Sequence, residues 1–226
     1  MQTVSSKYGK VQEHWNGIDM TMNARLANVL LQGGLSTGKT MTDNCEVRDQ
    51  YFNKVYIPSS LIGRGINTTA AAAAVSADNC HLETPFLTQL KFQGSYTLPW
   101  QDIQVSAALQ SIPGGRLQAN YTARNAVIKP SLNRDLSAGP TTTVSLQIVA
   151  PGSMYLERLN QLDLRLGKNI KLGGSTLKAS LGIFNALNEN TIIGANSAFG
   201  TDGALWLEPD SIVNARLLKF EAQLNF

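Results

Sequence analysis

The chain has 226 residues, of which 43% are apolar and only 15% are charged, with a formal net charge of +3. The charged share is low beside the roughly 25% of an average soluble domain, and the positive charges form no basic block that would indicate nucleic-acid binding. No run of about 18 apolar residues is present, which excludes a transmembrane helix. A wall of strands that faces lipid tolerates so few charges better than a soluble surface does.

The N-terminal residues Met1–Tyr8 contain neither a charged n-region nor an apolar h-region, so no signal peptide is visible. A mature outer-membrane protein must have carried one. We therefore expect either a cytoplasmic protein or a fragment of a longer protein in which Met1 is an internal or artificial start.

Strict alternation of apolar and polar residues recurs along the chain and predicts strands with one apolar and one polar face. In the first such segment, Ile18, Met20 and Met22 alternate with Asp19, Thr21 and Asn23. The predicted strands are Ile18–Leu26, Val29–Thr37, Thr88–Leu98, Ile103–Leu109, Asn160–Leu166, Leu177–Ile183 and Leu218–Phe226. Almost no stretch has the periodicity of an amphipathic helix, so the sequence predicts an all-β, antiparallel protein.

The connections between these strands alternate between short and long. Tight turns are expected at Ala27–Asn28, Pro99–Asp102 and Lys171–Ser175, and long polar segments at Met41–Pro85, Pro113–Met154 and Asn188–Asp210. This is the pattern of an up-and-down transmembrane β-barrel with periplasmic turns and extracellular loops. A soluble sandwich rarely carries three loops of this length without structure of their own. We predict a partial barrel of about seven strands whose last strand ends in the periplasm at Phe226.

The charged residues of the predicted strands fall on the polar faces, where a water-filled lumen would solvate them. A Lys or Arg that faces lipid at mid-depth costs ~2–4 kcal/mol. The predicted lumen-facing residues are Asp19, Arg25, Lys91, Asp163, Arg165, Lys178, Lys219 and Glu221. Asp163 with Arg165 and Lys219 with Glu221 are candidate ion pairs, although solvated wall residues are the simpler interpretation.

Aromatic residues fall near the predicted periplasmic rim, where a girdle of aromatic side chains is expected. They are Tyr96, Trp100 and the terminal Phe226. A soluble barrel or sandwich, with the apolar face turned into a core, explains the alternation equally well. It explains the asymmetry of the loops and the terminal Phe226 less well.

The two cysteines, Cys45 and Cys80, both lie in the first long polar segment. Their spacing is poor for a metal site. A disulfide that closes a long exposed loop is the favoured interpretation and implies an oxidising compartment, whereas two unpaired thiols are the alternative. The only histidines, His14 and His81, are distant in sequence, and no nucleophile elbow is present. We therefore predict no catalytic residue, cofactor or metal.

The segment Gly33–Thr40 reads GGLSTGKT and matches every fixed position of a P-loop. A P-loop must open a helix whose N-terminus faces the phosphates. The residues that follow show no apolar stripe at helical spacing, and no alternation of strands and helices is present from which a parallel sheet could be built. We therefore interpret Gly33–Thr40 as the Gly-rich upper part of a strand, and keep nucleotide binding only as a minor alternative.

Several strings resemble one family of membrane proteins. They are YGKVQEHWNGIDMTMNARL (Tyr8–Leu26), LLQGGLSTGKTMTDNCEV (Leu30–Val47), CHLETPFLTQLKFQGSYTLP (Cys80–Pro99) and RLNQLDLRLGK (Arg158–Lys168). They look like the C-terminal barrel segments of Oar-like TonB-dependent receptors, which carry a carboxypeptidase-regulatory-like domain. LGIFNALNENTI (Leu181–Ile192) resembles the penultimate strand of that family, and ARLLKFEAQLNF (Ala215–Phe226) resembles its C-terminal strand with the terminal aromatic residue.

The resemblance implies a large barrel of 22 strands with a plug domain inside and energy supplied through TonB. This sequence lacks a signal peptide, a TonB box, a plug and most of those strands. We therefore expect residues 1–226 to be the C-terminal part of the barrel domain of a receptor in the Gram-negative outer membrane. The expected partners are outer-membrane lipid, the barrel-assembly machinery (through the C-terminal signal Phe226), the TonB complex (through missing N-terminal regions) and an unknown transported ligand.

The expected role is to form wall and extracellular loops, without enzymatic activity, as part of the full-length receptor. Ligand contacts are expected in the long loops Thr42–Thr84, Arg116–Pro151 and Asn188–Asp210. The alternative is a soluble β-sandwich used for adhesion or structure, with P-loop nucleotide binding as the less favoured third interpretation.

Overall fold

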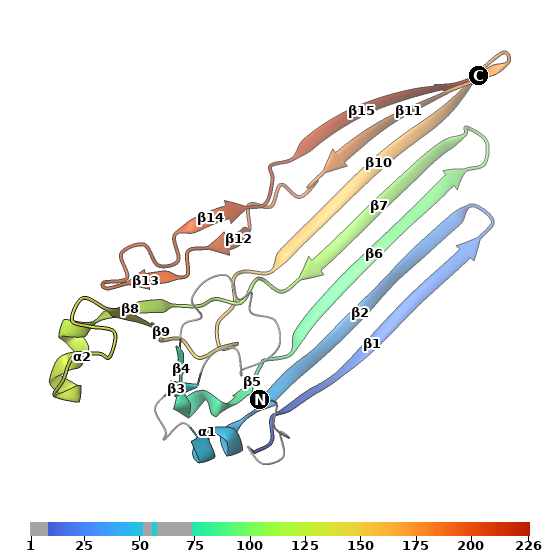
Figure 1. The fold of residues 1–226 in the computed structure, drawn as a ribbon. Helices are drawn as coiled ribbons and strands as arrows, with labels where there is room; N and C mark the ends of the chain where they lie inside the picture. The colour runs from blue at the N-terminus through green and yellow to red at the C-terminus, as the bar shows by residue number, and fades with distance from the viewer. Residues whose placement is uncertain (1–8, 52–55, 58–73) are drawn as a thin grey trace.

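A computed structural model describes residues 9–51, 56–57 and 74–226, and its main feature is one long antiparallel sheet (Figure 1). Its seven long strands are β1 (Gln12–Leu26), β2 (Val29–Asp43), β6 (Leu87–Leu98), β7 (Ile103–Ile112), β10 (Leu159–Leu172), β11 (Ser175–Phe184) and β15 (Leu217–Asn225). The expectation of an all-β, antiparallel fold is confirmed. The prediction about Met1–Tyr8 lies outside the described residues.

The long sheet is a meander in which each strand pairs with its neighbours along this series. The order is β1-β2-β6-β7-β10-β11-β15, and every pair is antiparallel. The short strand β5 (His81–Glu83) extends the pairing of the far end of β2. The three tight turns and the C-terminus lie at one end of the strands, which we call the turn end, and the long connections lie at the other (Figure 1). The predicted alternation of short and long connections is therefore present.

Several strands are longer than their alternation predicted. The pairing of β1 with β2 begins at Gln12 opposite Asp43 and continues without interruption to the turn. Because backbone hydrogen bonds do not depend on which face a side chain takes, the ladder continues through Trp15, Gly17 and Gly38, where the alternation is lost.

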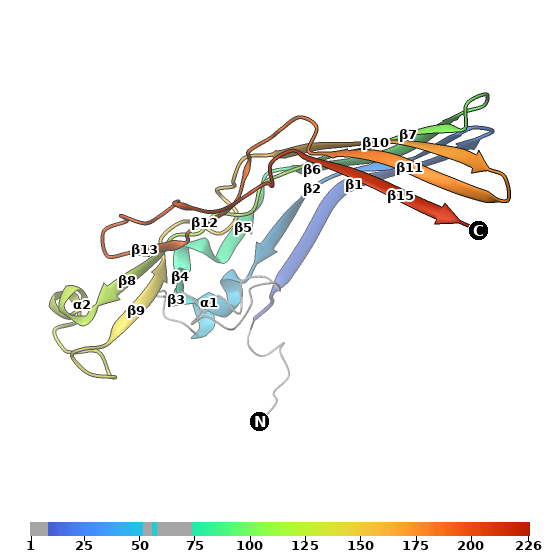
Figure 2. The same ribbon diagram turned by 90° about the horizontal axis from the view of Figure 1, so that it is seen from above.

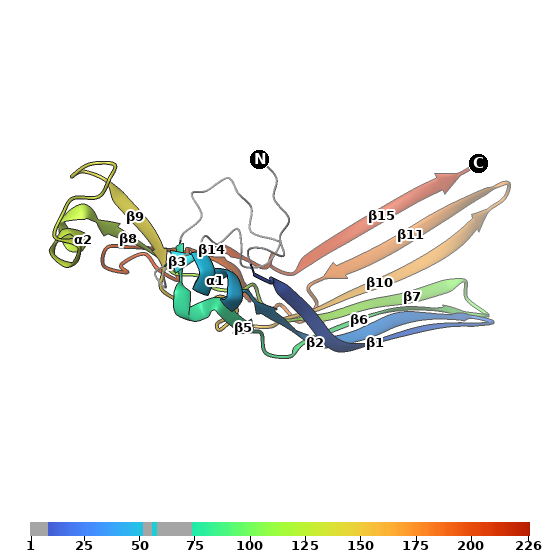
Figure 3. The same cartoon turned by 60° about the horizontal axis from the view of Figure 1, so that its bottom comes forward.

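The sheet is open within the described residues. Its outermost strands are β1 and β15, which pair with β2 and β11 on one side only. Figure 3 shows the sheet curved into a trough, with these two strands far apart. Such edges carry unpaired N–H and C=O groups that can accept a further strand.

The three long connections contain secondary structure of their own, so their length does not argue against a soluble sandwich. The first contains α1 (Cys45–Tyr51), β3 (Tyr56–Ile57), β4 (Ala74–Ser76), η3 (Ala77–Cys80) and β5. The second contains β8 (Asn120–Arg124), α2 (Asn125–Leu132) and β9 (Thr143–Gln147), and the third contains β12 (Ile192–Ala195), β13 (Ala198–Gly200) and β14 (Pro209–Ile212). We call residues 44–86, 113–158 and 185–216 together the outer region, where described.

A second sheet joins the three connections. Its order is β13-β8-β9-β4-β3, so each connection contributes at least one strand, and β12 pairs separately with β14. Figure 2 shows β8, β9 and α2 beyond the end of the long sheet. Among the described residues, the buried apolar side chains are Cys80, Ala119, Ala123 and Val213, all in the outer region. The long sheet therefore has no buried core of its own in the described part of the chain.

Candidate functional site

The register of the long sheet brings the predicted polar residues to one side. Residues directly opposite one another in a ladder share a face. One such row crosses all seven strands: Arg25, Leu30, Ser95, Ser106, Arg165, Gly182 and Lys219. Residues two positions apart on a strand share that face too. Asp19, Lys91, Asp163, Lys178 and Glu221 therefore join Arg25, Arg165 and Lys219 on what we call the polar face.

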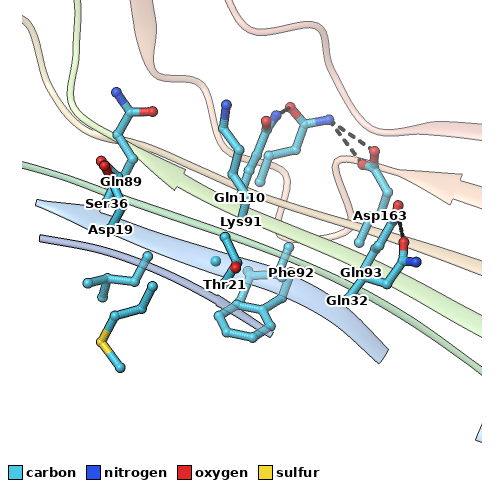
Figure 4. Close-up of a pocket in the computed structure, with 17 residues that line it drawn as sticks. Asp19, Thr21, Gln32, Ser36, Gln89, Lys91, Phe92, Gln93, Gln110 and Asp163 are labelled. Carbon is cyan, nitrogen blue, oxygen red and sulfur yellow. Dashed lines mark hydrogen bonds between the residues drawn. The ribbon is translucent and has the colours of Figure 1, made fainter. Parts of the chain in front are cut away.

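Amide side chains connect neighbouring strands across the polar face. Gln93 donates from Nε2 to Oε1 of Gln32 at 2.8 Å, and Gln110 donates to Gln161 at 2.9 Å. Gln161 in turn donates to the carboxylate of Asp163 at 3.0 Å. These residues line a hollow of 630 Å³. Figure 4 shows the side chains of Gln89, Lys91 and Asp163 on one side of the sheet and the ring of Phe92 on the other.

An ion-pair cluster lies nearer the turn end of the polar face. Glu221 accepts from Arg165 at 2.5 Å and lies 2.5 Å from the ammonium of Lys219, while Ser180 bridges Arg165 and Glu221. The candidate pair of Lys219 with Glu221 is therefore present. The candidate pair of Asp163 with Arg165 is replaced, because Arg165 turns to Glu221 and Asp163 accepts from Gln161.

Asn185 was not predicted as an important residue, yet it holds together three segments where the outer region meets the sheet. Its side chain is buried and donates to the carbonyl oxygens of Glu189 (2.8 Å) and Asn214 (2.9 Å). The Oδ1 atom of Asn185 accepts from the backbone amide of Glu189, and the backbone amide of Asn185 donates to the carboxylate of Asp163. The left-handed φ of 50°, which Asn adopts more readily than most residues, explains the residue type. Only the position directly after a strand could have indicated this role.

Trp15 was also missed by the sequence analysis. It lies on the polar face, two residues before Gly17, which pairs with Gly38 on β2. A Cβ built on Gly17 or Gly38 would lie 2.3 or 2.4 Å from the Trp15 ring. The indole ring therefore covers both glycine backbones and is half exposed. The signal in the sequence was the coincidence of a Trp with two glycines that become cross-strand partners.

The opposite face of the long sheet, which we call the apolar face, is exposed. One row crosses all seven strands: Leu26, Val29, Tyr96, Val105, Leu166, Leu181 and Phe220. Leu26 and Phe220 are 68% and 78% exposed, respectively. No described element covers this face. An uncovered apolar surface of this extent marks contact with another protein or with lipid.

Two lysines of the long strands lie on the apolar face: Lys39 of β2, close to the outer region and paired with Glu83, and Lys168 of β10. Lys168 pairs across the ladders with Ile103 and Ala179 and forms no ion pair with any described residue. It lies four residues before the last residue of β10, near the turn end. A long lysine side chain at such a position can extend its ammonium toward water while its stem stays in an apolar environment.

The predicted disulfide is confirmed. Cys45 and Cys80 are bonded, with their Cα atoms 4.9 Å apart, and join α1 to the residue before β5. Beside it, the Nδ1 atom of His81 lies 2.9 Å from the carboxylate of Asp43. Glu83 of β5 forms an ion pair with Lys39 of β2, and the hydrogen bond from Lys39 lowers the pKa of Glu83.

A second acidic group orders the connection around α2. The buried side chain of Asn125 donates to Asp135 at 2.7 Å and accepts from the Leu136 amide at 2.9 Å. Lys129 also lies within 3.1 Å of Asp135. The hydrogen bond from Asn125, followed by that from Lys129, lowers the pKa of the Asp135 carboxyl.

The geometry of Gly33–Thr40 is not that of a P-loop. These residues lie within β2, and Gly33–Gly38 pair with β1 on one side and β6 on the other. Backbone amides engaged in two ladders cannot form a phosphate cradle, and no helix begins at this segment. Among the described residues, no group of three or more His, Cys, Asp or Glu side chains could hold a metal ion, and no helix is long and apolar enough to cross a bilayer.

Comparison with known proteins does not assign the chain to a family. No family model matches it, and neither does any curated protein. The likeness of the strings to TonB-dependent receptors therefore remains a resemblance.

Proposed function

We propose that this chain forms part of the wall and the extracellular loops of a TonB-dependent receptor in the outer membrane of a Gram-negative cell. The observation that carries the proposal is the long sheet itself, which has one exposed apolar face, one polar face and tight turns at a single end. In an outer-membrane barrel the apolar face contacts lipid and the polar face lines the lumen.

Strand length and the placement of charge support this assignment. A spanning strand needs about 9–11 residues, and the seven long strands have 9 to 15. The eight predicted lumen-facing charges all share the polar face. Lys168 on the apolar face lies near the turn end, at a depth where its ammonium would reach the headgroups.

The open edges support a role within a larger assembly. Lipid does not tolerate unpaired backbone groups, so β1 and β15 need further strands to complete a barrel. In the proposed receptor those strands belong to the same polypeptide, together with a plug and the region that contacts the TonB complex. The exposed Phe226 would serve the barrel-assembly machinery as the C-terminal signal, and the outer region would meet the transported ligand.

A lipid-contact experiment on β7 tests the proposal. Single cysteines at Gln104, Val105, Ser106 and Ala107, each carrying an environment-sensitive fluorophore, are introduced into the full chain with the Cys45–Cys80 bridge oxidised. The protein is then refolded into vesicles that contain spin-labelled lipid. We expect quenching by lipid at positions 105 and 107, and quenching by a water-soluble agent at 104 and 106.

In protein that floats with the vesicles on a density gradient and has therefore incorporated, absence of lipid quenching at both Val105 and Ala107 would contradict the membrane assignment. If in addition both positions were protected from the water-soluble agent, the apolar face would be covered by protein, as in a soluble sandwich. The alternation between neighbouring residues serves as the internal control, because all four positions lie on the same strand.

A further inference from the structure

The end of the polar face away from the turn end holds an aromatic surface and a row of polar side chains that have no partner among the described residues. The Trp15 ring lies over Gly17 and Gly38, with Cζ2 close to both glycines. One side of the ring is therefore against the backbone, and the other is available, which agrees with its half-exposed state. The two glycines make this arrangement possible because any side chain there would meet the ring.

The next row toward the turn end on the same face consists of Asp19, Ser36 and Gln89. Figure 4 shows these three side chains beside one another. Rows on one face are about 7 Å apart, because two strand residues separate them. None of the three side chains forms a hydrogen bond or ion pair with a described residue, so a carboxylate, a hydroxyl and an amide remain free for a ligand beside the Trp15 ring.

The remaining lining of the hollow combines uncharged polar groups with apolar side chains. The polar groups include Thr21, Gln32, Gln93, Gln110 and Gln161, the further charged groups are Lys91 and Asp163, and the apolar side chains include Met20, Leu35, Phe92 and Leu109. Amides and hydroxyls both donate and accept hydrogen bonds, whereas a site for a phosphate or carboxylate ligand would present Arg side chains in bidentate geometry. The chemistry therefore favours a neutral ligand with many hydroxyl groups.

We infer that this part of the polar face binds a neutral oligosaccharide, with one sugar ring stacked on Trp15 and its hydroxyls bound by Asp19, Ser36 and Gln89. The C–H groups on one face of a sugar carry slight positive charge and contact the electron-rich face of an indole. The amide side chains of the hollow would bind the following sugar units. The inference deepens the proposed function, on which it rests for the direction of transport, because it names the substrate class.

Binding is measured by calorimetry with maltohexaose, cellohexaose and laminarihexaose as probes. The full chain is kept in lauryldimethylamine oxide, because a maltoside detergent would itself compete. We expect at least one hexasaccharide to bind, and Trp15→Ala to weaken that binding about tenfold or more, equivalent to the loss of one good aromatic contact. Trp15→Phe should retain part of the affinity. Gln223→Ala, on the same face but on β15 and outside the lining of the hollow, should bind like the unaltered chain.

A second variant moves the ring without removing it. A Cβ on Gly38 would lie within 2.7 Å of three Trp15 ring atoms and of no backbone atom among its nearest neighbours. Gly38→Ala should therefore displace the indole and weaken binding, whereas Asp19→Ala should weaken it through a lost acceptor. Circular dichroism of each variant establishes that the sheet is retained.

The inference is overturned if none of the three hexasaccharides binds, or if Trp15→Ala and Gly38→Ala both bind as the unaltered chain does. The β7 fluorescence measurement separates this failure from that of the proposed function. Lipid contact without sugar binding would reject the oligosaccharide site and leave the membrane wall standing. Sugar binding without lipid contact would reject the wall and leave a sugar-binding β-sheet protein.

Discussion

At the scale of single residues, the hydrogen bonds of Asn185 join three segments of the chain. We expect Asn185→Ala to destabilise the fold by about 2–3 kcal/mol, because the hydrogen bonds of a buried side chain to the backbone of Glu189 and Asn214 are lost. Asn185→Gly keeps the left-handed backbone accessible and should cost slightly less. Urea unfolding in detergent measures both.

Asn188→Ala is the matched control, because Asn188 also has a positive φ but is exposed, and among the described residues its side chain makes one hydrogen bond, accepted from the Arg216 amide. Its loss of stability should be clearly smaller. Equal losses for the two alanine variants would show that backbone conformation, and not the side-chain contacts of Asn185, decides the stability.

Acidification should loosen two parts of the outer region. The pKa values of Glu83 and Asp135 are lowered in the folded state, so their interactions stabilise the fold above the ordinary carboxyl pKa and are lost as pH falls through the lowered values. Between pH 7 and about pH 3, the amide protection factors of β5 and of the residues around α2, which are corrected for the intrinsic pH dependence of exchange, should fall. Both groups are exposed, so the effect should be local. In Glu83→Gln, the protection factors of β5 should depend less on pH, and an unchanged dependence would reject the role of Glu83.

The polar-face residues could be predicted from the sequence because alternation alone assigns a residue to a face. Asp19, Lys91 and Lys219 could be assigned to the polar face without knowledge of their neighbours in space. Trp15 and Asn185 could not be predicted, because their roles depend on partners that only the pairing register supplies. Gly38, the partner of Gly17, is 21 positions away in sequence, and Asn214 is 29 positions from Asn185.

At the scale of elements, β7 offers two adjacent alanines on opposite faces. Ala107 pairs with Gly94 and Leu164 on the apolar face, and Ala108 pairs with Gln93 and Asp163 on the polar face. In a bilayer, Ala107→Lys should cost ~2–4 kcal/mol near mid-depth, whereas Ala108→Lys should be nearly neutral beside Asp163. Unfolding in urea from lipid vesicles measures both. Equal costs for the two variants would contradict lipid contact at the apolar face.

The disulfide should stabilise the first long connection and not the long sheet. It closes a loop between residues 35 positions apart, for which the chain-entropy model gives about 4 kcal/mol at most. Reduction should expose α1 and β5 to proteolysis and leave the amide protection of β7 and β10 unchanged. The double variant Cys45→Ser/Cys80→Ser should behave like the reduced protein, and a loss of protection in β7 would show that the bridge supports the whole fold.

The seven long strands could be predicted because each has a polar and an apolar face. Their ends could not, since the pairing of β1 with β2 continues where the alternation stops. The strands of the outer region are short, and four of them, β4, β8, β9 and β13, obtain their partners from another connection or from beyond a helix. No local pattern in the sequence identifies such partners.

At the scale of the whole molecule, the open edges and the exposed apolar face should make the isolated chain associate with itself. In water without detergent, β1 and β15 offer unpaired backbone groups and the apolar face offers a large hydrophobic surface. Light scattering should show oligomers that grow with concentration and disperse in detergent. A stable monomer in water at all concentrations would contradict an uncovered apolar face.

The second sheet also has a consequence for assembly. Its ladders join β13 to β8, through Ala198 and Asn120, and β4 to β9, through Ala74 and Leu146, residues more than 70 positions apart. Hairpins such as β10–β11 form from local contacts, whereas these ladders must wait until neighbouring hairpins stand side by side, because closing long loops costs entropy first. The amides of the strands in the outer region should therefore become protected from hydrogen exchange last. Their protection shows that the neighbouring hairpins are already in their native positions.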